Sequence, residues 1–227
     1  KGFVRTKDKN CIDKFKNGAK LRTFDEVKNL DEYAGILADD VILVDIDDMN
    51  QSEIMMDIVE DLQLDCIVYQ TTRGRHFLFK NNGVDKCGTH KKIAIGLTAD
   101  IKVGSRNSYE IIKFNGEERF VEWDCEELGT LPKWFVPVNS NIDFFDMKEG
   151  QGRNQALFNY ILTLTSAGFT QEESRECIRL INKYVLHSPL SEDELNVIIR
   201  DEAFPEETFY DGKKFLHNNF AVFLKIM

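Results

Sequence analysis

Short apolar runs separated by polar residues fill the first 140 residues of the chain. The runs at 41–46, 66–70 and 76–79 are brief and rich in β-branched or aromatic residues, so they predict three strands. Between the first two runs, apolar residues recur at helical spacing, which predicts an amphipathic helix over 52–62. A strand, a helix and two further strands in succession are typical of an α/β layer.

Weaker signals surround this unit. A Thr and a Glu at capping-box spacing predict a short helix in the segment 23–37. A fourth strand is expected within 93–103, and an Asn-Gly turn predicts a hairpin between strands at 109–113 and 119–123. The fold class that follows is α+β, with an α/β-layered first domain built on a mixed sheet.

The pattern changes after residue 152. Three segments with apolar residues at helical spacing follow a polar, glycine-containing stretch, and two of them open with a capping box. We therefore expect a small all-α domain at 153–204, joined through a linker at 141–152 to a first domain at 1–140. The apolar residues 205–227 are expected to begin a further element.

Composition narrows the class of protein. Of 227 residues, 42% are hydrophobic and 30% are charged, as in ordinary globular proteins. No apolar run approaches the roughly 18 residues that span a bilayer, so no membrane partner is expected. Five scattered cysteines, an odd number, favour a reducing cytoplasm over a disulfide framework. The chain begins with lysine, so we expect a processed chain or a piece of a longer one.

Charge is unevenly distributed along the chain. The formal net charge of −10 argues weakly against nucleic acid as a partner. Residues 73–106, however, carry eight Lys or Arg against two Asp, and the first twenty residues carry seven against two. A basic part beside an acidic part suits a protein that binds polyanions with one face, although an ordinary uneven surface also gives such counts.

The strand at 41–46 leads into three acids, Asp45, Asp47 and Asp48. Because residues i and i+2 of a strand share a face, Asp45 and Asp47 are expected side by side, with Cα atoms about 6.5–7 Å apart. Paired carboxylates repel each other unless a cation separates them, and hard divalent ions prefer oxygen ligands. Asp100 is a candidate third carboxylate for a two-ion site. A D-x-D pair is also common without any metal, and Asp48 is expected to cap a turn or helix.

The turn after the strand at 66–70 is rich in hydrogen-bond donors. Gly74 permits a close approach of the backbone to a ligand, and the neighbouring side chains suit phosphate oxygens. A single histidine is more often structural, but its neighbours favour phosphate binding by His76. Lys102 shares the strand face of Asp100, where a cation beside metal-binding acids suits a triphosphate.

Three segments in this order, LVDIDD, TTRGRHFLF and ADIKVG, resemble the motifs of the archaeo-eukaryotic primase superfamily, in particular the primase-polymerases of phages and plasmids. That family has a strand ending in D-x-D, a Ser/Thr-containing turn whose histidine opens a strand, and a strand with an acid followed by a basic residue. The likeness covers roughly 10–138. Residues 153–204 are similar to the helical primase C-terminal domain, and 209–224 to the lead-in of a phage helicase.

The resemblance implies an RRM-like core and a template-directed nucleotidyltransferase that makes and extends primers on single-stranded DNA. Asp45, Asp47 and Asp100 would hold two Mg²⁺ or Mn²⁺ ions, and His76 would complete the catalytic set. The residues implied to bind the incoming NTP or dNTP are Thr71, Thr72, Arg73, Gly74, Arg75, His76 and Lys102. Many relatives are richer in Gly or Ser at the two arginine positions of this turn.

The implied setting is phage or plasmid replication in a bacterial cytoplasm, with a helicase following this chain. No G-x-x-x-x-G-K-S/T motif is present, so an ATPase site is not expected within these residues. Two other functions use the same features. The acids could serve a metal-dependent nuclease or phosphodiesterase, or the chain could be a non-catalytic nucleic-acid-binding scaffold that docks a helicase.

Overall fold

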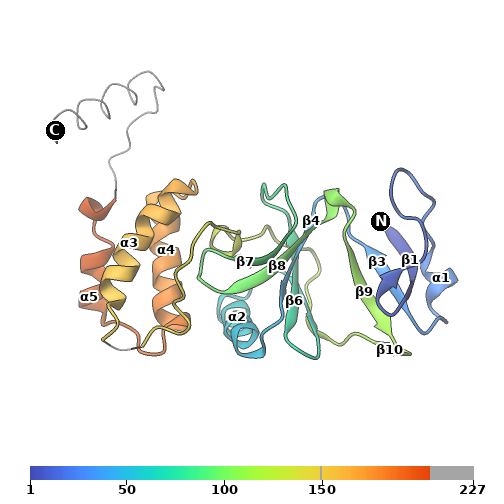
Figure 1. The fold of residues 1–227 in the computed structure, drawn as a ribbon, viewed down its shortest axis with the longest axis horizontal. Coiled ribbons are helices and arrows are strands. Elements are labelled where there is room, and N and C mark those ends of the chain that lie inside the picture. The colour runs from blue at the N-terminus through green and yellow to red at the C-terminus, as the bar shows by residue number, and fades with distance from the viewer. Residues whose placement is uncertain (149, 205–227) are drawn as a thin grey trace, which may run out of the picture.

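The chain forms an α+β fold with two antiparallel sheets that lie side by side and helices at one end (Figure 1). The structure is a computed structural model, and it describes residues 1–148 and 150–204. Residue 149, in the predicted linker, and the predicted further element at 205–227 lie outside the described residues. None of the helices in the described part is long and apolar enough to cross a membrane.

The larger sheet has the strand order β11-β5-β6-β4-β8-β7. Its strands are β4 (Val41–Ile46), β5 (Ile67–Gln70), β6 (Arg75–Lys80), β7 (Gly88–Lys92), β8 (Thr98–Val103) and β11 (Val121–Trp123). Every strand pair of this sheet is antiparallel, so the prediction of a mixed sheet is wrong. The reason is the β5–β6 hairpin, which places β6 between the two parallel strands β4 and β5.

Helix α2 (Met49–Leu62) crosses from β4 to β5 and covers one face of this sheet. Asp48 caps it by accepting a hydrogen bond from the backbone N–H of Gln51 at 2.9 Å, which confirms the predicted cap. Alternate residues of β4, such as Val44 and Ile46, are buried against the apolar face of α2. The opposite face of β4 therefore carries Asp45.

The smaller sheet has the order β10-β9-β3-β1-β2 and was not predicted. Its strands are β1 (Gly2–Lys7), β2 (Asn10–Cys11), β3 (Tyr33–Ile36), β9 (Tyr109–Phe114) and β10 (Glu117–Glu118). The capping box of Thr23 and Glu26 is present, but the helix α1 (Phe24–Val27) that follows is a single turn. The rest of the segment 23–37 contributes β3.

The predicted hairpin at the Asn-Gly turn exists, but its second strand is short. Strand β9 turns into β10 through Asn115 and Gly116, which both have positive φ angles. Residues 121–123 do not continue this hairpin, because β11 pairs with β5 of the larger sheet. The chain thus returns from one sheet to the other within a few residues.

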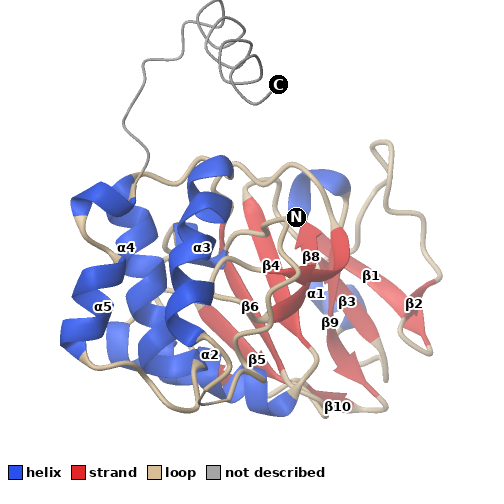
Figure 2. Ribbon diagram, turned by 60° about the vertical axis from the view of Figure 1, so that its left-hand side comes forward, coloured by secondary structure: helices blue, strands red, loops and turns tan. Residues whose placement is uncertain are grey.

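The helices α3 (Arg153–Ser166), α4 (Gln171–Leu180) and α5 (Glu192–Ile198) lie at the end opposite the smaller sheet (Figures 1 and 2). The two predicted capping boxes, at Thr170 and Ser191, are present. The buried apolar residues of the three helices belong to the same hydrophobic cluster as those of the larger sheet and α2. The buried hydroxyl of Tyr160 donates a hydrogen bond to the backbone carbonyl of Ala94 at 2.8 Å, which ties α3 to the sheet side of this core.

Candidate active site

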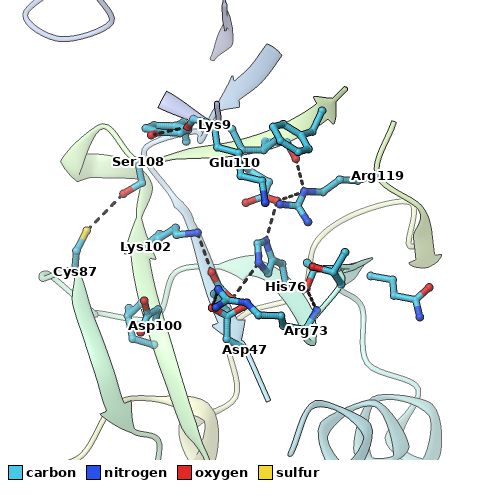
Figure 3. Close-up of a pocket in the computed structure, with 18 of the residues that line it drawn as sticks. Lys9, Asp47, Arg73, His76, Cys87, Asp100, Lys102, Ser108, Glu110 and Arg119 are labelled. Atoms are coloured by element: carbon cyan, nitrogen blue, oxygen red, sulfur yellow. Dashed lines mark hydrogen bonds and ion pairs between the residues drawn. The ribbon is translucent and has the colours of Figure 1, made fainter. Parts of the chain in front are cut away.

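A cleft of about 970 Å³ lies between the two sheets. Strands β4, β6 and β8 and the turn at 71–74 line one side, and β9 lines the other (Figure 3). The cleft therefore receives the face of the larger sheet that α2 does not cover. It collects the three segments that the sequence singled out.

Three polar residues form a row across the centre of the sheet. Asp45 in β4 is directly opposite His76 in β6 on one side and Asp100 in β8 on the other. Directly opposed residues in adjacent strands project from the same face, so all three side chains face the cleft. The structure thus places three of the four residues that were expected to be catalytic on one face of the sheet.

Asp45 has an oxygen without a hydrogen bond. Its side chain is 9% exposed, and Oδ1 lies 3.0 Å from Nε2 of His76 in an ion pair. This contact lacks hydrogen-bonding geometry, so Oδ1 is a buried oxygen with no hydrogen-bond partner among the described residues. Asp47 lies just past the end of β4, and one ligand atom from each of Asp45, Asp47 and His76 falls within 4.8 Å of the others.

Cationic side chains already neutralise both acids. Lys102 donates a hydrogen bond from Nζ to Oδ2 of Asp45 at 3.0 Å. Arg73 donates from Nη2 to Oδ2 of Asp47 at 2.5 Å, and both partners of this pair are largely exposed. Positive charges therefore lie where the resemblance implies metal ions and phosphate groups.

The cluster shifts the pKa values of its two buried members in opposite directions. Burial alone would raise the pKa of Asp45, but the adjacent imidazole of His76 and the ammonium group of Lys102 lower it to about 2. Burial alone would lower the pKa of His76, but Asp45 and Glu110 outweigh it and raise the pKa above its ordinary value. The two acids therefore favour the protonated form of His76, and an imidazolium is not a metal ligand.

Asp100 is adjacent to the cluster but turned away from it. Its Oδ1 accepts a hydrogen bond at 2.8 Å from the backbone N–H of His90, a residue of β7 with a positive φ angle. The Asp100 side chain is 34% exposed, so nothing buried fixes it in this orientation. The third predicted metal ligand lies on the expected strand and face, but outside the group of ligand atoms.

The turn at 71–74 owes its shape to two of the residues predicted to bind phosphate. The hydroxyl of Thr71 accepts hydrogen bonds from the backbone N–H groups of Arg73 and Gly74 and donates one to the carbonyl of Gly74. A Cβ on Gly74 would lie 1.8 Å from the carbonyl oxygen of Ile46. The close approach of the end of β4 thus requires glycine at this position. Thr72 and Arg73 are exposed where the turn lines the cleft, whereas Thr71 is half-buried.

Arg75 lies on the opposite face of the sheet, so its predicted contact with phosphate is wrong. Its Nε and Nη2 donate to the carboxylate of Glu122 at 2.6 and 2.9 Å, and Nη1 donates to Ser52 of α2 at 3.1 Å. Consecutive strand residues face opposite ways, and His76 takes the face of the cleft. Arg75 therefore anchors α2 and β11 beneath the site.

Two residues of the site were not found from the sequence. Glu110 of β9 is 2% exposed, and its Oε1 lies 2.8 Å from Nδ1 of His76. The same oxygen lies 3.0 Å from Nε of Arg119, which follows β10. A charged residue within an otherwise apolar strand segment was the available signal, but its partner lies on the other sheet.

The residues present fit a divalent cation. The fit rests on Asp45, whose buried Oδ1 has no hydrogen bond among the described residues and lies beside a second carboxylate. Carboxylate oxygens are the ligands that hard divalent cations prefer. Among the described residues this is the group of acids and histidines with ligand-atom spacing suited to a metal.

Comparisons of this chain with protein-family models, with curated proteins and with solved structures find no match.

Proposed function

We propose that this chain is a divalent-metal-dependent nucleotidyltransferase of the primase-polymerase type, which makes and extends primers on single-stranded DNA. One observation carries the proposal. A buried carboxylate oxygen of Asp45 without a hydrogen bond faces the cleft beside Asp47, and cations surround both acids. The resemblance of the three motif segments to primase-polymerases gives this arrangement its function.

Asp45, Asp47 and Asp100 would hold two Mg²⁺ or Mn²⁺ ions, with Asp100 turning from the backbone of His90 toward Asp45. When bound, the ions would lower the pKa of the attacking 3′-hydroxyl and stabilise the leaving pyrophosphate. His76 is left out of this ligand set, because the two acids beside it favour its protonated form. Its role is to donate a hydrogen bond to the triphosphate.

Charge balance explains why this site suits both metal and triphosphate. The inner cleft contains four carboxylates and four cations: Asp45, Asp47, Asp100 and Glu110, with Arg73, His76, Lys102 and Arg119. A nucleoside triphosphate carries about four negative charges, which two divalent ions balance. Ions alone would leave the inner cleft strongly positive, and nucleotide alone would leave it negative, so the neutral combination is the two together.

The chain's own residues would then exchange partners. Arg73 and Lys102, which now neutralise Asp47 and Asp45, would move to phosphate oxygens when the acids bind metal. Thr72 is exposed on the turn and would add a hydroxyl donor. Thr71, Gly74 and Arg75 would act through the shape of the turn, without contacting the nucleotide.

The arrangement of the elements also supports the proposal. The order β5-β6-β4-β8, with α2 crossing from β4 to β5, is that of a split βαβ unit, on which RRM-like cores are built. Between β6 and β8 the chain forms the edge strand β7, where the sequence of elements in such a core has its second helix. We further propose that α3–α5 are the helical primase C-terminal domain.

Single-stranded DNA would enter at the end of the cleft where residues 9–16 meet β9 of the smaller sheet. Lys9 and Lys16 line this end together with Phe15 and Tyr109, whose rings pack edge to face. Basic side chains interleaved with aromatic rings suit a single strand, because the rings stack on bases of any sequence. A helicase following this chain, in the cytoplasm of a bacterial host, completes the proposed setting.

Primer synthesis tests the proposal. Purified protein is incubated with single-stranded template, Mn²⁺ and NTPs or dNTPs, and products are resolved on a denaturing gel. We expect short products from the wild type and none from an Asp45→Asn, Asp47→Asn double variant. The matched control is Asp48→Asn, because asparagine still caps α2 and no site contact is lost.

Each alternative function predicts a different result. Continued polymerisation by the double variant would overturn the proposal. Shortening of labelled DNA in the absence of nucleotides would favour the nuclease, whose reaction runs in the opposite direction. DNA binding that is unchanged in the double variant, with no product from the wild type, would favour the non-catalytic scaffold.

A further inference from the structure

Glu110 links the two sheets at the centre of the cleft. It belongs to β9 of the smaller sheet and is almost fully buried, yet its carboxylate meets His76 of the larger sheet. Figure 3 shows Glu110 projecting onto the imidazole from the opposite wall, with Arg119 alongside. Burial of a carboxylate costs free energy unless cationic groups pair with it. The buried position of Glu110 therefore favours an orientation of His76 in which the imidazole contacts its carboxylate.

The imidazole of His76 is held from both ends. Its Nε2 pairs with Oδ1 of Asp45 at 3.0 Å, and its Nδ1 hydrogen bonds to Oε1 of Glu110 at 2.8 Å. The contact with Asp45 lacks hydrogen-bonding geometry, whereas the contact with Glu110 has it. Glu110 therefore fixes the ring plane and keeps a proton on Nδ1, as carboxylates that hydrogen bond to functional histidines do.

Arg119 fixes Glu110 in turn. Its Nε lies 3.0 Å from Oε1 of Glu110 and 2.6 Å from the carbonyl oxygen of Ile111, so the guanidinium is tied to the backbone of β9. The position of Glu110 is thus set within the smaller sheet, independently of Asp45. The hydrogen bond between Glu110 and His76 should therefore persist when the oxygens of Asp45 bind another cation.

We propose that Glu110 is the positioning residue for His76, and that it keeps the Nε2 edge of the imidazole facing the triphosphate while Asp45 binds metal. This inference rests on the proposed function. Glu110 touches neither nucleotide nor metal in this scheme and acts only through the imidazole. The smaller sheet would therefore supply the orientation of a catalytic group that the larger sheet carries.

A double-mutant cycle between Glu110 and His76 tests the proposal. Glu110→Gln preserves the shape of the side chain but removes its charge. We expect kcat for nucleotide addition to fall about tenfold to a hundredfold, with the affinity for Mn²⁺ unchanged within about twofold. In a His76→Ala background the same substitution is expected to change kcat by less than about threefold, because its target is absent.

A loss of equal size in both backgrounds would overturn the proposal, since a general structural role acts regardless of His76. Glu127→Gln, which removes an exposed carboxylate paired with Lys80 outside the cleft, is the matched control for loss of charge. Thermal unfolding of each variant identifies any that has lost its fold. Glu110→Asp provides a further check, because its shortened carboxylate is expected to leave kcat low.

Nuclear magnetic resonance gives a readout that needs no activity. In the metal-free protein, the ¹⁵N shifts of His76 are expected to show Nδ1 protonated and hydrogen bonded, and Glu110→Gln is expected to move the Nδ1 signal. An unchanged signal would overturn the proposal even if the enzyme polymerises. A wild type that makes no product, with the signal shift as expected, would instead refute the proposed function and leave the contact intact.

Discussion

Asp45 and Asp100 lie directly opposite each other in β4 and β8, but their carboxylates do not meet, because Asp100 accepts the backbone N–H of His90. We expect this bond to open when the second ion binds. Asp100→Asn should therefore leave the fold intact and lower primer synthesis roughly a hundredfold or more, since a metal supplies several kcal/mol of transition-state stabilisation. Manganese titration followed by electron paramagnetic resonance, in the presence of a non-hydrolysable triphosphate, should find one ion fewer than in the wild type. Two ions in the variant would contradict the assignment of Asp100.

Removal of a cation from the site should strengthen metal binding. Arg73→Gln frees Asp47, so the affinity for Mn²⁺ alone should rise by up to about fivefold, the worth of an exposed ion pair. The affinity for triphosphate with metal should fall in the same variant, because Arg73 is then missing from the phosphate. Isothermal titration calorimetry measures both.

The matched control for this experiment is Lys80→Gln, which removes an exposed cation far from the acids and should change neither affinity. Lys102→Gln should act like Arg73→Gln but more strongly, since its partner Asp45 is buried. A decrease in affinity for Mn²⁺ alone in either site variant would show that the two cations do not compete with the metal.

Arg75 and Arg73 are two residues apart in the sequence, but their substitution should have different effects. Loss of Arg75 should lower stability, and loss of Arg73 should lower nucleotide affinity. Arg75→Met leaves Glu122 and Ser52 without their partner, so the free energy of unfolding should fall by roughly 3 kcal/mol, as for other broken buried pairs. Nucleotide affinity should change less than about twofold. Urea unfolding measures the stability of both arginine variants, and calorimetry measures their nucleotide affinity. A large loss of nucleotide affinity in Arg75→Met would contradict the assignment of Arg75 to the opposite face.

The buried imidazole should make stability depend on pH in the metal-free protein. Asp45, Glu110, Arg119, Lys102 and the cross-strand neighbour Tyr69 face His76, and the two acids raise its pKa. A folded-state pKa above the unfolded value stabilises the protein fully below about pH 6.5, and this stabilisation is lost as pH rises through the folded-state pKa.

The lost stability should be about 1.4 kcal/mol for each unit by which the pKa is raised. Urea unfolding between pH 6 and pH 9 measures it, and His76→Gln should remove the slope. The lowered pKa of Asp45 acts in the opposite direction, because its contribution is lost only as pH falls through about 2. It is therefore constant over the measured range. Equal slopes in wild type and variant would contradict the assignment of charge to His76.

Local pattern was enough to predict the central part of the fold and most of the site. Residues 41–46 form an apolar, β-branched run that leads into acids, and the two-residue period of a strand placed Asp45 and Asp47 on one face, beside each other. The face of Arg75 could have been inferred as well. The predicted strand began at His76, one residue late, and adding that residue puts Arg75 on the opposite face.

Other features depend on contacts that no local pattern encodes. The orientation of Asp100 follows from an irregularity in the pairing of β7 with β8, which places the N–H of His90 against its carboxylate. The role of Glu110 follows from the packing of one sheet against the other. The smaller sheet was missed because its paired strands lie far apart in the sequence, so that β3 finds its partner β9 some 75 residues later.

The pairing of β3 with β9 also bears on how such a chain can evolve. The wall that presents Glu110 is assembled from two pieces of chain that flank all three motif segments on either side. Recombination that exchanged only the stretch between those pieces would transplant the acids and the histidine into a wall shaped by another ancestor. Inheritance of the whole block, from the first strand to β11, is therefore the exchange that keeps a working cleft.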